Sequence, residues 1–160
     1  MTFLVVNATL LKKMLRVLLK TCTCNTEGNT KMAKDDYEVI VFKILTYLYA
    51  CLRRGQSVDK TILSPTSVCF CKNGASLQET YWHNVLCMMS EEGLIAGLNF
   101  TRPWGNGTAI YINDITDCRI TPTGIRYLSE NSQVRNIFIQ LKKQGDLIVS
   151  LAEFTLPFLN

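Results

Sequence analysis

The segment that most constrains the fold is residues 117–131, where an expected strand passes directly into an expected helix. Thr121 is suited to cap this helix, because its hydroxyl can accept a hydrogen bond from a free amide of the first turn. Pro122 fits the first helical position, where no backbone donor is needed, and Gly124 permits close approach of another backbone segment. An apolar stripe on one side of the helix is formed by Ile125 and Leu128.

The chain before this segment predicts helices followed by a hairpin. Apolar residues at helical spacing predict one buried face on a helix over residues 36–54, which Gly55 ends. A short helix is expected over 58–63 and a short extended run over 68–71. After a turn at 72–74, Ser76 is expected to cap a helix over 77–91. Extended structure is expected over 94–101, 109–115 and 119–121, on both sides of a turn-rich tip at 102–107.

A helix, a strand, a second strand and a new helix follow one another in the order of a winged helix-turn-helix. We therefore predict an α+β, mainly α fold with a two- to three-stranded antiparallel wing and a C-terminal helical extension. Residues 32–131 form the expected winged-helix domain, and residues 132–160 the final helix, ended by Gly145, and an apolar tail. Such a tail should pack on the body or on a second copy, and we expect a homodimer through this C-terminal region.

The positive charge of the chain lies in its first 31 residues. The net charge is +4; residues 1–31 hold five basic residues against Glu27, and residues 32–160 hold 12 basic and 12 acidic residues. Because nonspecific DNA binding depends on phosphate neutralisation, this balance argues against a strongly basic binding body. We expect residues 1–31 to be a flexible leader or an upstream extension of the gene model, with translation starting at Met32. A basic amphipathic helix at 10–20 that touches a membrane surface is a weaker alternative, and no membrane-spanning segment is expected.

Catalytic and metal chemistry are not favoured by the residues present. The chain has seven cysteines and one histidine, and its two Cys-x-Cys pairs do not match the usual zinc-ligand spacing. We expect buried or incidental thiols in a reducing cytoplasm, with a metal site as the minor alternative. The sequence also offers no nucleophile elbow, no phosphate-binding loop and no paired acid cluster. We therefore expect no enzyme activity, no catalytic residue, no metal and no cofactor.

The helix over 77–91 is the candidate recognition helix. Its buried face should comprise Trp82, Val85, Leu86 and Met89, and its opposite face Thr80, His83, Asn84 and Cys87. Amide, hydroxyl and imidazole groups can hydrogen-bond base edges in double-stranded DNA. The candidate DNA-binding residues, including three from the wing, are Gln78, Thr80, His83, Asn84, Arg102, Trp104 and Asn106. The alternatives are a plainly solvated helix face and a Trp104 ring that folds back on the core.

Four blocks of sequence resemble the YjcQ family of small bacterial and prophage-encoded winged-helix proteins. The resemblance spans residues 32–143 and lies in residues 36–45, Tyr81-Trp82, residues 92–97 and, most specifically, residues 120–132, ITPTGIRYLSENS. It implies the winged-helix fold, and a family of unassigned biochemical role. With the candidate residues above, we expect a cytoplasmic DNA-binding transcriptional regulator. The alternative is a non-catalytic protein-interaction adaptor on the same scaffold.

Overall fold

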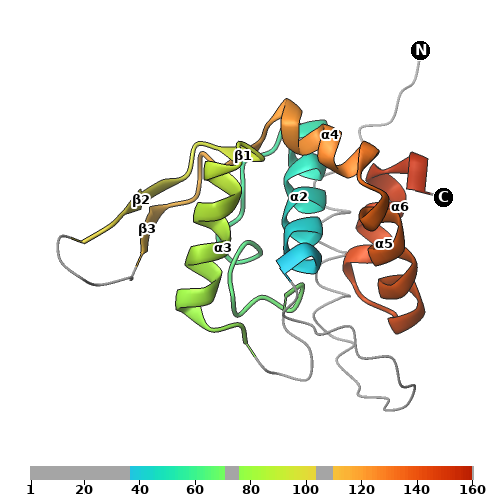
Figure 1. Ribbon diagram of the computed structural model, residues 1–160, viewed down its shortest axis with the longest axis horizontal. Helices are drawn as coiled ribbons and strands as arrows, with labels where there is room; N and C mark the ends of the chain where they lie inside the picture. Colours follow the sequence, from blue (N-terminus) through green and yellow to red (C-terminus); the bar gives the residue numbers. More distant parts are fainter. Residues whose placement is uncertain (1–36, 71–75, 104–109, 160) are drawn as a thin grey trace. The chain divides into compact units, whose positions relative to one another are not determined.

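The computed structural model describes residues 37–70, 76–103 and 110–159 (Figure 1). Helices α2 and α3 are followed by four short strands and then by helices α4 to α6. The fold is mainly helical with small antiparallel strand pairs, as expected for an α+β winged helix. The expectations for residues 1–31, for the 72–74 turn and for Trp104 and Asn106 concern residues outside the described part of the chain.

Helix α2 (Tyr37–Arg54) is the centre of the structure. It ends where the sequence predicts, but its burial is not limited to one face, because every residue from 39 to 48 is buried. The physical reason is that α3, α4, α5, α6 and β4 all pack against it. Lys43 and Thr46 are therefore buried together with the apolar side chains.

The segment between α2 and α3 differs from the prediction. Residues 58–63 form a turn rather than a short helix: Asp59 accepts from the Thr61 amide through Oδ1 at 2.8 Å and from the Leu63 amide through its carbonyl at 3.0 Å. The expected extended run at 68–71 is also wrong, because residues 68–70 lie in turns and the Phe70 amide donates to the Ser67 carbonyl at 2.9 Å. In both places local side-chain and backbone hydrogen bonds replace regular structure.

Helix α3 (Glu79–Glu91) begins two residues later than predicted. Gln78 is its N-cap and makes no side-chain capping bond, so Ser76 does not cap this helix. The predicted buried residues Trp82, Val85, Leu86 and Met89 are all buried. Cys87 is buried too, which corrects its assignment to the exposed face.

The wing is one hairpin divided into two antiparallel pairs. Strand β1 (Ile95–Ala96) pairs with β4 (Arg119–Ile120), and β2 (Asn99–Thr101) pairs with β3 (Tyr111–Asp114). A register shift in β2 and the positive φ of Gly97 lie near the division. Figure 1 shows the β2–β3 arm extending past α3, away from α2. The antiparallel neighbourhood on which the winged-helix prediction depends is thus present.

The predicted passage from strand to helix is confirmed. Thr121 caps α4 (Pro122–Glu130), with its hydroxyl accepting from the Gly124 amide at 3.1 Å. The same hydroxyl lies 3.0 Å from the Leu94 carbonyl, which also accepts from the Thr121 amide at 3.1 Å. These bonds fix the start of α4 beside β1.

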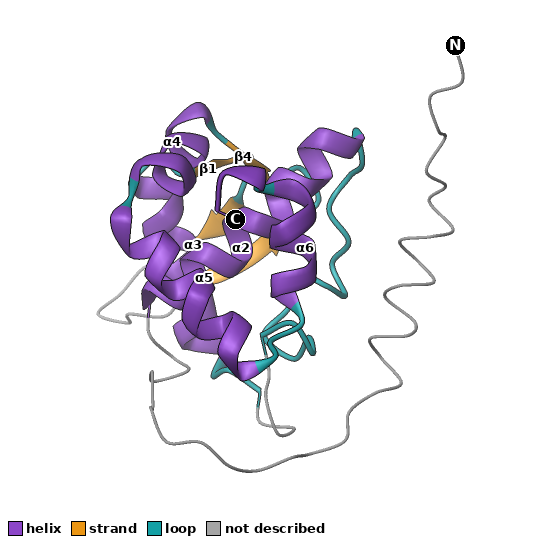
Figure 2. Ribbon diagram, turned by 90° about the vertical axis from the view of Figure 1, so that its right-hand side faces the viewer, coloured by secondary structure: helices purple, strands orange, loops and turns teal. Residues whose placement is uncertain are grey.

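The C-terminal segment packs on the body. Helix α5 (Ser132–Gln144) ends at Gly145, as predicted, and Gly145 adopts the left-handed conformation with φ 67°. Helix α6 (Ile148–Thr155) and the 3₁₀ helix η1 (Pro157–Leu159) follow, and α6 has its most extensive contact with α2. Figure 2 shows α5 and α6 beside α2. In the described part of the chain, no helix combines the length and apolarity needed to cross a bilayer.

Candidate nucleic-acid interface

The amino-terminal half of α3 presents polar side chains to solvent. Gln78 and Thr80 are exposed and Asn84 is half-buried. Thr80 and Asn84 lie one helical turn apart, so both fall on the same outward stripe, which continues to the exposed Met88. Of the predicted site residues, these three retain polar groups directed away from the core.

His83 is turned toward the wing. Its Nδ1 atom lies 2.8 Å from the carbonyl oxygen of Ile110, immediately before β3, and its side chain is only 15% exposed. Because a carbonyl can only accept, Nδ1 carries a proton. The other ring nitrogen, Nε2, lies 3.9 Å from the carboxylate of Glu79 on the preceding turn of α3. His83 therefore joins α3 to the wing. This role could be recognised only from the tertiary structure, because its partner is distant in the sequence.

Arg102 is held by the carboxyl-terminal end of α3. Its Nη2 atom forms an ion pair with the Glu91 carboxylate and lies 3.3 Å from the Cys87 sulfur. The hydrogen bond to Cys87 and the neighbouring Glu91 raise the pKa of Arg102. The wing cation thus neutralises an acid on α3. Thr80 and Glu91 are separated by roughly 16 Å along the helix axis, so Arg102 and the exposed polar stripe occupy opposite ends of α3.

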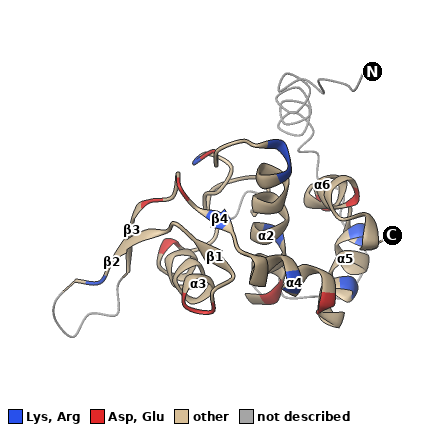
Figure 3. Ribbon diagram, turned by 90° about the horizontal axis from the view of Figure 1, so that it is seen from above, with Lys and Arg blue, Asp and Glu red and all other residues tan. Residues whose placement is uncertain are grey.

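The electrostatic character of α3 is acidic. The helix carries no Lys or Arg, and its carboxylates are those of Glu79 and Glu91, with Glu92 directly after it. Figure 3 shows acidic positions on α3, basic positions on α5, and both signs of charge on α4. A DNA contact made by α3 alone therefore lacks the phosphate-neutralising charge that supplies most binding free energy.

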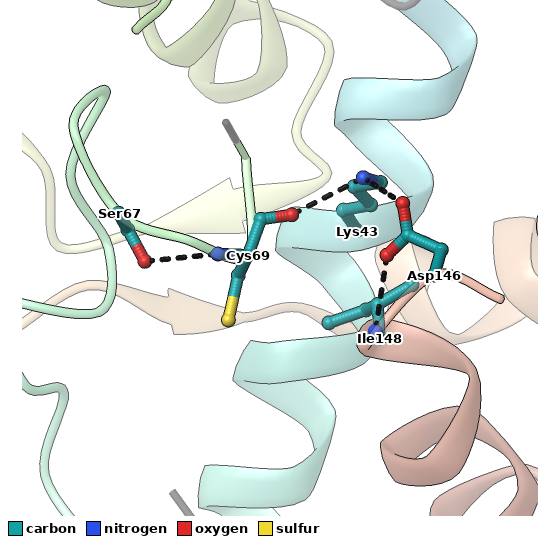
Figure 4. Close-up of polar contacts among 5 residues, drawn as sticks. All are labelled: Lys43, Ser67, Cys69, Asp146 and Ile148. Atoms are coloured by element: carbon teal, nitrogen blue, oxygen red, sulfur yellow. Dashed lines mark hydrogen bonds and ion pairs between the residues drawn. The ribbon is translucent and has the colours of Figure 1, made fainter. Parts of the chain in front are cut away.

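A buried polar cluster lies against α2, where the 67–70 turns and the segment before α6 meet this helix (Figure 4). Lys43 Nζ is 2.6 Å from Asp146 Oδ2 and 3.1 Å from the Cys69 carbonyl oxygen, and the other carboxylate oxygen accepts from the Ile148 amide at 3.1 Å. The side chains of Lys43 and Asp146 are 10% and 16% exposed. The cluster connects α2, the 67–70 turns and the start of α6, which indicates a structural brace. Its only sequence signal is a lysine within the apolar run of α2.

The cysteines in the described ranges are free thiols. Burial raises the pKa of Cys118 to about 12 and also raises the pKa of Cys51 and Cys69, so these three are held as neutral thiols. Among residues 37–70, 76–103 and 110–159, no three His, Cys, Asp or Glu side chains lie close enough together to hold a metal ion.

Comparison with known proteins identifies one family. The family described as YjcQ protein matches residues 42–147, from within α2 to the residue before α6. No curated protein and no solved structure matches the chain. The family match covers well over half of the 160 residues and includes the strand-to-helix passage at Thr121. This chain belongs to the YjcQ family.

Proposed function

We propose that this protein is a cytoplasmic, non-catalytic DNA-binding regulator of bacterial or prophage origin. The observation that carries the proposal is the exposed polar stripe on α3, beside a wing, in a winged-helix arrangement. Thr80 and Asn84 present a hydroxyl and an amide one turn apart, with Gln78 exposed at the start of the helix. Asn and Gln amides pair well with the edge of adenine in the major groove. The helix–wing arrangement is one that many DNA-binding domains use.

Selection from a pool of randomised duplexes with the full chain tests this function. A groove-reading protein should enrich a defined sequence, and Asn84→Ala should weaken binding to that sequence by about 1–3 kcal/mol with little change in salt dependence. Gln56→Ala, an exposed amide in the turn after α2, is the matched control and should leave binding unchanged. Failure of the full chain to bind any duplex at low salt would refute DNA binding.

A protein-interaction adaptor is the second candidate. The specific observation in its favour is the charge around α3. The cation of Arg102 is taken up by Glu91, and the carboxylates of Glu79 and Glu92 remain without a Lys or Arg on the helix, so this surface is negatively charged. A surface of this kind favours a basic protein partner over phosphate. The adaptor would be favoured if the selection experiment enriched no DNA sequence and the chain captured one defined protein. Glu79→Gln and Glu92→Gln should then abolish binding to that protein.

We also propose a homodimer through the C-terminal region. After α6 packs on α2, Phe154 and Phe158 still expose 64% and 44% of their surface. Deleting α6 would uncover the core of α2, so surface substitutions are the cleaner test. Light scattering of Phe154→Ser with Phe158→Ser should give the monomer mass, whereas Met88→Ser, an exposed apolar residue on α3, should leave the dimer intact. A monomeric parent protein would refute this proposal.

A further inference from the structure

Helix α5 carries an exposed face with an unusual charge composition for this chain. Its outward residues follow the 3–4 spacing of one helix face and are all exposed: Ser132, Arg135, Asn136, Ile139, Gln140 and Lys143. No Asp or Glu occurs from residue 131 to residue 145. Residues 32–160 hold 12 basic and 12 acidic residues in total, and α5 supplies three of the basic ones, so the remainder has three more acidic than basic residues. The exposed face of α5 is therefore cationic within an otherwise acidic body.

The orientation of this face is fixed by packing. Val134, Ile137, Phe138 and Leu141 are buried on the opposite side of α5, which packs against α2 and α6. The Asn131 side chain caps the first turn by accepting from the Gln133 amide at 2.9 Å, and Gly145 ends the last turn. The cationic face therefore belongs to a well-anchored helix and does not depend on a loop.

The charges on this face are available to a ligand. Lys142, at the side of the face, is occupied by an ion pair with Glu153 at 2.7 Å. Arg135 and Lys143 form no ion pair with any residue in the described ranges, in contrast to Arg102, which Glu91 holds. Figure 3 shows the basic positions of α5 on the side of α2 away from the acidic α3.

The spacing of the two available cations fits a DNA duplex. Arg135 and Lys143 are eight residues apart, which places them about 12 Å apart along the helix axis. The major groove is also about 12 Å wide between its phosphate backbones. Asn136 and Gln140 lie between the two cations, where amides donate to phosphate or contact base edges. One cation at each end and amides in the middle suit a helix that lies against a groove.

We propose that the outward face of α5 binds the phosphate backbone of double-stranded DNA through Arg135 and Lys143. This inference rests on the proposed function and assigns the affinity-giving contacts to α5.

The test measures the salt dependence of binding to a mixed-sequence duplex of about one or two turns by fluorescence anisotropy. The parent is the full chain with Lys12, Lys13, Arg16 and Lys20 replaced by Gln, which leaves Lys31 balanced by Glu27 and so gives residues 1–31 no net charge. Arg135→Gln with Lys143→Gln should lower the magnitude of the slope of log K against log salt by about 2, since each lost phosphate contact contributes roughly 0.9.

Two control variants show whether the position of the lost charges matters, and thermal melting shows whether each variant is folded. Arg119→Gln with Arg126→Gln removes the same charge from exposed positions outside α5 and should leave the slope unchanged. Arg135→Lys with Lys143→Arg keeps both charges and should retain the parent slope. Thermal melting of each variant, followed by circular dichroism, verifies that the fold is kept.

Each outcome bears on a different statement. An α5 variant with the parent's slope and affinity would overturn the α5 assignment and leave DNA binding standing. Absence of duplex binding by the parent at low salt would overturn both statements. Tighter binding of the parent to single-stranded RNA or to vesicles of phosphatidylglycerol than to the duplex would overturn DNA as the ligand.

Discussion

Replacing Gly124 with alanine tests the closest backbone approach that the fold makes at the start of α4. A Cβ atom on Gly124 would lie 2.4 Å from the Leu94 carbonyl oxygen, 2.8 Å from Cγ1 of Ile120 and 3.3 Å from Cδ2 of Leu45. Ordinary carbon–oxygen contacts are near 3.3 Å or longer, so α4 would have to move away from β1 by about 1 Å. The site cannot accept the methyl group by a side-chain adjustment alone, because the nearest atom belongs to the backbone.

The expected cost combines three contributions. Overpacking of a well-filled site costs about 1–3 kcal/mol. Moving α4 also weakens the Thr121 bonds to the Leu94 carbonyl, each with a net value of about 1 kcal/mol. Alanine offsets about 1 kcal/mol through its better helix propensity. We therefore expect Gly124→Ala to lower the free energy of unfolding by about 2–3 kcal/mol.

Urea unfolding of the full chain, followed by far-ultraviolet circular dichroism, measures this difference. Gly145→Ala is the matched control, since Gly145 has a positive φ of 67° but open space where the Cβ would lie. Its cost should be limited to the left-handed backbone conformation, roughly 1 kcal/mol. If Gly124→Ala were as stable as the parent, or more stable than Gly145→Ala, helix propensity would outweigh the contact and the argument from close approach would be wrong.

Two further changes test polar interactions. Lys43→Met leaves the Asp146 carboxylate buried without its cation and should lower the free energy of urea unfolding by about 3–5 kcal/mol. Adding Asp146→Leu should recover much of this loss. A double variant as unstable as Lys43→Met would contradict the role of this ion pair as a structural brace. Hydrogen bonds from Thr116 and the ion pair with Lys60 hold the pKa of Asp114 well below its usual range, so this carboxylate stabilises the fold at neutral pH and loses that effect as acid protonates it. Asp114→Asn should therefore lower the melting temperature at pH 7, and its difference from the parent should shrink below about pH 4; a gap independent of pH would refute the assignment.

Local sequence signals predicted the parts of the fold that depend on backbone geometry. Thr121 and Pro122 mark the start of α4 because capping and proline placement act within one turn of helix. Gly145 marks the end of α5 for the same reason, since a left-handed residue suits glycine. The turn around Asp59 was missed because its side-chain bond competes with helix formation in a way that residue spacing does not reveal.

The candidate site was less predictable because its contacts join distant parts of the chain. His83 satisfies helical periodicity as an exposed residue, yet it bonds the Ile110 carbonyl, 27 residues away. Cys87 likewise has the spacing of an outward position, but its side chain is buried and contacts Arg102, which follows strand β2 of the wing. The cationic face of α5 had a readable sequence signal, the lack of acids from 131 to 145, but only packing shows that its cations point outward.

The division of the wing at Gly97 has a consequence for self-association. Either pair contains strands of only two to four residues, and a Cβ at Gly97 would lie 2.1 Å from the Asp117 carbonyl oxygen, so the bend is tied to glycine. A long straight hairpin would offer continuous unpaired amides and carbonyls along its rim, on which another chain adds as an extra strand. Because the edge of the hairpin is interrupted, a strand from another molecule could form only a few consecutive hydrogen bonds with it. The exposed β2–β3 arm is thereby protected from edge-to-edge strand pairing between molecules.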